Sequence, residues 1–149
     1  MIKKNFLNKL LIIYLFFTSI SFSENNHYYD KGKILFDKKE FEKSKFQFEK
    51  DIVFNPKNEK SYLYLAKIFN KEENEQIEEL NLNSVLILNP KNDEAMYMLI
   101  LLKIKQYDYN KAKELIKKFN LVCKTFCSKK TEIQEKFNKL TPENAKNNN

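Results

Sequence analysis

The tetrapeptide Asn-Pro-Lys-Asn occurs twice in this chain, at residues 55–58 and 89–92, with a spacing of 34 residues. From this spacing, three segments of 34 residues align without gaps: 25–58, 59–92 and 93–126. A period of this length indicates stacked copies of one supersecondary unit. Large apolar residues recur in the same columns, namely Tyr28, Tyr62 and Met96; Leu35 and Phe69; Phe48, Leu82 and Ile116; Ile52 and Leu86.

The apolar spacing inside each unit predicts two helices. In the first unit, one stripe consists of Tyr28, Gly32, Leu35 and Phe36, and a second of Phe41, Ser44, Phe48 and Ile52. The second helix is expected to end at Asn55, because a following proline disfavours the helical conformation. A helix pair buries one face only by stacking on the next pair. The chain has only one glycine and three prolines, and β-rich folds need these residues for tight turns. The predicted fold is therefore all-α, with three stacked antiparallel helix pairs.

These columns resemble the tetratricopeptide repeat. The first unit matches at Tyr28, Gly32, Leu35, Ser44, Phe48 and Pro56, the second at Tyr62, Leu65, Ala66, Phe69, Leu82 and Pro90, and the third at Met96, Leu99, Ala112 and Ile116. The resemblance covers residues 25 to about 120 and implies a right-handed solenoid. Three residues depart from the pattern: Asp51 and Glu78 occupy small-residue sites, and Lys103 replaces a large apolar residue. We expect a local shift in packing around Lys71–Glu79.

The first 23 residues predict an export signal. Lys3, Lys4 and Lys9 precede an apolar run at residues 10–20, and Ser21-Phe22-Ser23 fits a cleavage site. The run is shorter than the roughly 20 residues of a membrane span. The prediction is an exported protein, periplasmic or secreted, that meets the membrane only transiently. An uncleaved anchor and a cytosolic amphipathic start are the alternatives.

The repeat domain is expected to extend from residue 24 to residue 140. Ile133, Phe137 and Leu140 would lie on one face of a helix at about 131–140, and this helix would cap the exposed end of the solenoid. Residues 141–149, TPENAKNNN, are almost without apolar side chains, and we expect them to be disordered.

Cys123 and Cys127 are the only cysteines. In an oxidising compartment they could form a disulfide. On a continuous helix their spacing suits a bridge poorly, and both would then be small buried thiols. Both interpretations stand. A metal site is disfavoured, because His27 is the only histidine and lies far away in the sequence.

No arrangement of residues in the sequence predicts catalysis, and we expect no enzyme activity, no cofactor and no metal. The net charge of +7 raises nucleic acid as a ligand. However, all 27 basic residues are lysine, and arginine dominates the bidentate recognition of phosphate and guanine. We therefore predict a protein or peptide partner and no nucleic acid.

The resemblance implies that the first helix of each pair lines a concave groove. In this sequence the groove set would be Tyr29, Lys33, Phe36, Leu63, Lys67, Asn70, Lys71, Tyr97, Leu101, Ile104 and Lys105. Lysines beside apolar platforms favour an acidic partner segment with apolar anchors. The predicted function is a scaffold or adaptor of the bacterial cell envelope. The alternative is a structural or self-associating module of envelope assembly, and a homo-oligomer is left open.

Overall fold

The computed structural model describes residues 27–140. The predicted export signal at 1–23 and the predicted tail at 141–149 lie outside these residues. All regular elements of residues 27–140 are helices, which confirms the all-α prediction. They are α2 (His27–Asp37), α3 (Phe41–Phe54), α4 (Glu59–Lys71), α5 (Glu75–Leu88), α6 (Asp93–Lys105), α7 (Tyr109–Val122), the short 3₁₀ helix η1 (Cys127–Lys129) and α8 (Lys130–Leu140).

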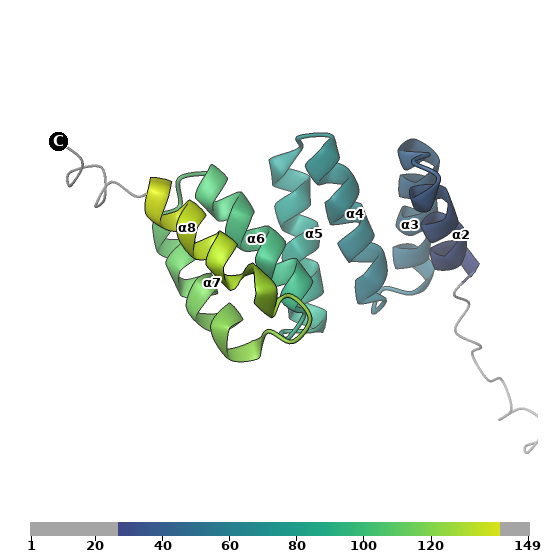
Figure 1. Cartoon of the computed structure of the whole chain (residues 1–149). Helices are drawn as coiled ribbons and strands as arrows, with labels where there is room; N and C mark the ends of the chain where they lie inside the picture. The colour runs from purple at the N-terminus through teal and green to yellow at the C-terminus, as the bar shows by residue number, and fades with distance from the viewer. Residues whose placement is uncertain (1–26, 141–149) are drawn as a thin grey trace, which may run out of the picture.

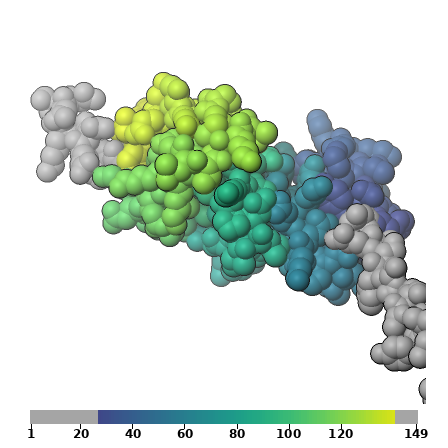
Figure 2. Space-filling view, turned by 90° about the horizontal axis from the view of Figure 1, so that it is seen from below, coloured from purple at the N-terminus to yellow at the C-terminus, as the bar shows by residue number. Residues whose placement is uncertain are grey.

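The helices form three successive pairs, α2 with α3, α4 with α5 and α6 with α7 (Figure 1). Each pair packs on the next through α3 against α4 and α5 against α6. Helix α8 packs on both α6 and α7 and covers the last pair. The space-filling view shows the pairs in chain order along the long axis (Figure 2). The arrangement is the predicted solenoid of stacked helix pairs with a C-terminal cap.

The two Asn-Pro-Lys-Asn segments are the turns that join one pair to the next. The Asn58 backbone N–H donates to the Asn55 carbonyl at 2.9 Å, and Asn92 donates to Asn89 at 3.1 Å. Proline suits the second position of such a turn because its φ is already set. The side chains of Asn58 and Asn92 then cap α4 and α6 by accepting from backbone N–H groups. Each turn therefore ends one helix and starts another.

The turns inside the pairs are also built alike. Lys39, Glu73 and Tyr107 occupy the same repeat position, and their φ angles are 62°, 56° and 61°. Around Glu73, the N–H of Asn74 donates to the carbonyl of Phe69 at 2.9 Å, as in the αL turns that end many helices. The turn inside the second pair therefore matches the other two in its backbone, and a shift in packing around Lys71–Glu79 stays a prediction.

Helices α2 and α3 approach closely at the only glycine. A Cβ atom added to Gly32 would lie 2.8 Å from Cε1 of Phe48, whose side chain is completely buried. The Ser44 hydroxyl donates to the Gly32 carbonyl at 2.8 Å across the same contact. The equivalent pairs in the second and third repeats are Ala66 with Leu82 and Ile100 with Ile116. In the first two repeats a larger residue on one helix is thus matched by a smaller one on its partner, whereas the third repeat uses two residues of equal size.

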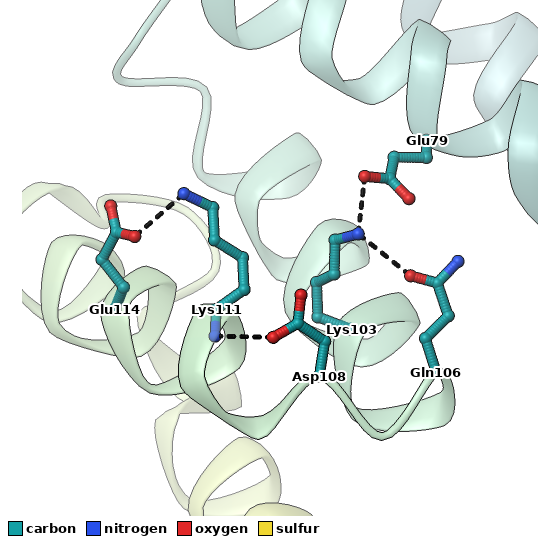
Figure 3. Close-up of polar contacts among 6 residues, drawn as sticks. All are labelled: Glu79, Lys103, Gln106, Asp108, Lys111 and Glu114. Carbon is teal, nitrogen blue, oxygen red and sulfur yellow. Dashed lines mark hydrogen bonds and ion pairs between the residues drawn. The ribbon is translucent and has the colours of Figure 1, made fainter.

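The charged residues that depart from the repeat pattern are accommodated by specific partners. The buried Asp51 carboxylate accepts hydrogen bonds from Asn55, Asn58 and Ser61, so it joins α3 to the turn and to α4. Lys103 donates to Glu79 on α5 at 2.5 Å and to Gln106 at 3.0 Å (Figure 3). Because each charge meets a hydrogen-bond partner, the stacking continues past these sites.

The apolar core consists of two clusters. The N-terminal cluster is built on Phe48, Leu65 and Ile68 and is surrounded by aromatic side chains. In this cluster the rings of Phe48 and Tyr64 stack with centroids 5.0 Å apart. The larger cluster extends from α4 to α8, is mainly aliphatic, and includes Ile133 of the cap. The cap is therefore attached to the core and not only to the surface of the last pair.

Candidate protein-binding groove

A cavity of about 230 Å³ lies where α4, α5 and α6 meet. Its wall is mostly apolar, and one buried carboxylate and one lysine contribute to it. Four of the eleven predicted groove residues line it, together with three that the sequence analysis did not select. The lining residues are Asn70, Glu78, Tyr97, Met98, Leu101, Leu102 and Lys105.

A second hollow of about 320 Å³ lies between α6 and α8. It shares Leu101 and Lys105 with the first, so the two adjoin along one face of α6. Its other lining residues are Ile104, Tyr107, Lys136 and Leu140. We call the two hollows together the α6 groove. A third hollow, of about 400 Å³, lies between α2 and α3 and contains none of the predicted groove residues.

Glu78 is the unexpected group in the α6 groove. Its side chain is 2% exposed, and its Oε1 accepts a hydrogen bond from the Asn70 amide at 3.0 Å. Burial raises the pKa of this carboxyl. The hydrogen bond from Asn70 and the charge of Lys105 lower the pKa, but they offset the effect of burial only in part. The equivalent positions in the other repeats are Ser44 and Ala112. The sequence identified Glu78 as a departure from the pattern but did not identify it as part of a site.

Three of the predicted groove lysines are already engaged by carboxylates. Lys33 pairs with Asp37 at 2.7 Å, and Lys67 pairs with Glu94 at 2.7 Å. Lys105 lies 2.8 Å from Glu75. The fourth, Lys71, lies over the ring of Phe41, 5.1 Å from its centroid. The groove thus has no row of unpaired lysines, and the structure supplies no basis for a preference for acidic segments.

The predicted groove residues near the N-terminal end belong mainly to the core. Tyr29 and Phe36 are half-buried and pack against Tyr64 in the aromatic cluster. Leu63 is 8% exposed, lies in the larger core cluster and lines neither hollow of the α6 groove. Ile104 is also buried, yet it contributes to the wall of the second hollow.

Tyr97 connects the α6 groove to the capping helix. Its hydroxyl donates a hydrogen bond to Glu132 on α8 at 2.8 Å. The centroid of its ring lies 5.7 Å from the ring centroid of Phe126. Hydrogen bonds from Lys129, Tyr97 and Lys136 lower the pKa of Glu132 to about 2. The cap therefore holds a groove side chain in place.

Asp93, the first residue of α6, holds the backbone segment that follows α7 against the start of α6. One Asp93 carboxylate oxygen accepts backbone N–H groups of Lys124, Thr125 and Phe126 at 2.7 to 2.9 Å. Burial alone would raise the pKa of Asp93, but the hydrogen bonds from Phe126, Lys124 and Thr125 outweigh it and lower the pKa to about 2. This contact replaces the Asn-Pro turn of the earlier repeats.

Cys123 and Cys127 form a disulfide next to this contact. Helix α7 ends at Val122, and Cys123 has an extended ψ of 142°. The helix does not continue through both cysteines, so the geometric objection raised for a continuous helix does not apply. The Cα atoms lie 5.2 Å apart, within the range that a disulfide bridges.

Within residues 27–140 there is no group of three His, Cys, Asp or Glu side chains that could hold a metal ion. No helix in the same range is long and apolar enough to cross a membrane.

Comparison with known proteins finds a likeness of fold. No protein-family model matches this chain, and no curated protein matches its sequence. Solved structures do match, among them a chain of a CopN–Scc3 complex, with a TM-score of 0.66 and 18% sequence identity. The match covers 78% of this chain and 70% of the other. At this identity the comparison supports the helical-repeat fold, and membership of the tetratricopeptide family stays a prediction.

Proposed function

We propose that this protein is a non-enzymatic scaffold that binds a segment of a partner protein in the α6 groove. The observation that carries the proposal is the pair of adjoining hollows along α6, which share Leu101 and Lys105. Their walls combine apolar side chains with a few polar groups, as is usual at recognition sites. The structural neighbour comes from a complex of two proteins, which agrees with a binding role.

A substitution in the shared part of the groove tests this proposal. Leu101→Arg places a charged side chain between the two hollows, and we expect at least a tenfold loss of affinity for captured partner peptides. Leu80→Arg is the matched control, because Leu80 is 57% exposed on α5 and lines neither hollow. Affinity is measured by fluorescence anisotropy on the full-length protein. Equal binding by wild type and Leu101→Arg would contradict the proposal.

A row of exposed apolar residues favours the second candidate function, self-association. Val53, Ile87 and Leu121 occupy the same position in the three repeats, near the ends of α3, α5 and α7. Their exposed fractions are 74%, 80% and 86%. Light scattering across a concentration series tests this alternative. A dimer that dissociates when all three residues are changed to serine would support it, and a monomer at every concentration would exclude it.

We also propose that the scaffold works outside the cytoplasm, in the periplasm or after secretion. The support is the basic and apolar pattern of residues 1–23 together with the Cys123–Cys127 disulfide, because disulfides persist in oxidising compartments. Cell fractionation with N-terminal sequencing tests this proposal. A cytoplasmic chain that begins at Met1 and has two titratable thiols would contradict it.

A further inference from the structure

We propose that the first hollow of the α6 groove receives a cationic side chain, lysine or arginine, of the partner segment, with Glu78 as its counter-charge. This inference rests on the proposed function and specifies the chemistry of the partner. It differs from the acidic partner that the lysine content of the sequence favoured.

The position of Glu78 is the first argument. The equivalent residues Ser44 and Ala112 are small and buried between the two helices of their pairs. A carboxylate at this position loses its hydration and stabilises the fold only if partners compensate it. In the described chain its hydrogen-bond partner is the neutral amide of Asn70. Stability alone therefore gives no reason for an acidic residue here.

The charge around the hollow is the second argument. Lys105 is the basic residue in its wall, and its Nζ lies 2.8 Å from Glu75. Its side chain is 59% exposed, so it faces solvent more than it faces the interior. When ionised, Glu75, Glu78 and Lys105 together carry one net negative charge. One incoming cation would balance this charge.

The shape and lining of the hollow are the third argument. Its volume of about 230 Å³ far exceeds the roughly 10–15 Å³ that a cavity needs to hold one water. Met98, Leu101 and Leu102 offer an apolar wall for the methylene stem of a long basic side chain. Glu78 and the carbonyl oxygen of the Asn70 amide can then accept hydrogen bonds from its charged end.

Selection from a random peptide library on the full-length protein tests the inference. We expect the peptides whose binding requires Leu101 to share one lysine or arginine flanked by apolar residues. Replacing that residue with norleucine should weaken binding at least tenfold. Glu78→Gln should weaken binding of the original peptide by a similar factor, and the two changes together should cost little more than either alone.

Two controls keep the test specific. Glu114→Gln removes a half-exposed carboxylate on α7 that does not line the hollow, and should leave affinity unchanged. Glu78→Gln keeps an oxygen that can accept from Asn70 and removes a buried charge, so its melting temperature should not fall. A lower melting temperature would mean that Glu78 is a structural residue and would overturn the inference.

The remaining outcomes separate the two proposals. Peptides that require Leu101 but lack a basic residue would overturn this inference and leave the proposed function intact. The same holds if Glu78→Gln binds within twofold of wild type. If no selected peptide depends on Leu101, the proposed function fails and the inference fails with it.

Discussion

Helices α2 and α6 occupy the same place in their repeats but differ greatly in burial. Gly32 is the only buried residue of α2, whereas α6 buries seven residues from Asp93 to Ile104. Helix α6 packs against α5, α7 and α8, while α2 packs mainly against α3. The difference teaches that equivalent helices of a repeat array are buried to very different extents, because burial depends on how many neighbouring helices cover each one.

The two repeats also fill the contact between their helices differently. In the first, Gly32 makes room for the Phe48 ring, and in the third, Ile100 and Ile116 are of equal size. The same backbone arrangement is thus reached with one very large and one very small residue, or with two of medium size. Packing constrains the combined volume of the pair more than either residue.

The largest effect is expected in the third repeat. Ile100→Ala removes a completely buried side chain from the larger core cluster and should lower the free energy of unfolding by about 2–5 kcal/mol. Urea denaturation followed by circular dichroism measures it. The exposed Ile34→Ala on α2 is the control and should change stability by less than about 0.5 kcal/mol. Equal losses at the two sites would contradict the comparison.

A smaller effect of unusual sign is expected in the first repeat. Glycine to alanine inside a helix normally stabilises by about 1 kcal/mol. Gly32→Ala should instead destabilise by about 1–3 kcal/mol, because the new Cβ meets the Phe48 ring. Adding Phe48→Leu reproduces the Ala-Leu pair of the second repeat and should recover most of the loss. Hydrogen exchange should locate the change in α2 and α3, and a stabilised Gly32→Ala would refute the packing argument.

Asp93→Asn should cost about 2 kcal/mol at neutral pH, since it weakens charge-assisted hydrogen bonds to three backbone N–H groups. The pKa of Asp93 in the folded protein, about 2, lies below the ordinary aspartate pKa of 3.8. The stabilisation is therefore present above pH 3.8 and is lost as the pH falls towards 2. Denaturation at a series of pH values should show wild type and variant converging in this window.

The second repeat supplies the matched control for Asp93. Glu59 occupies the same repeat position and accepts one hydrogen bond, from the Asn89 amide at 2.9 Å. Glu59→Gln should therefore cost less than about 1 kcal/mol at neutral pH. If Asp93→Asn and Glu59→Gln lower the free energy of unfolding equally, the hydrogen bonds from residues 124–126 to Asp93 do not add the stability expected of them.

The smallest effects are expected at the turns, which the repeats share. Lys39→Gly and Glu73→Gly should each stabilise the fold by about 0.5–1 kcal/mol, because both residues have a positive φ that glycine adopts without strain. Lys38→Gly, one residue earlier, lacks a positive φ and should not stabilise. Thermal melts compare the three variants. Destabilisation by both Lys39→Gly and Glu73→Gly would show that their side chains matter more than their backbone.

Most of the fold could be predicted because the repeat carries it. The spacing of the two Asn-Pro-Lys-Asn turns, together with apolar residues at helical intervals, predicted three helix pairs, and α3 ends at Phe54, just before Asn55 and Pro56. The sequence did not predict the turns within the pairs in detail. A positive φ is usually signalled by glycine, and these positions are occupied by Lys39, Glu73 and Tyr107 instead.

The candidate site could be predicted only in part. Asn70, Tyr97, Leu101 and Lys105, four of the residues that the resemblance assigned to a groove, line one hollow. It could not show that Lys67 would meet Glu94 or that Lys105 would meet Glu75, because these pairs join different helices. Nor could it show that Glu78, at a position where the pattern expects a small residue, would line the hollow.

The sequence by itself determined the period, the helix pairs and their turns, since these follow from local periodicity and from proline and asparagine at fixed places. The tertiary structure decided which charges are neutralised, where a hollow remains and how the last repeat is closed. These depend on contacts between residues far apart in the chain, such as Asp93 with Lys124 and Tyr97 with Glu132. Contacts of this kind form only when the stacked helices bring both partners together.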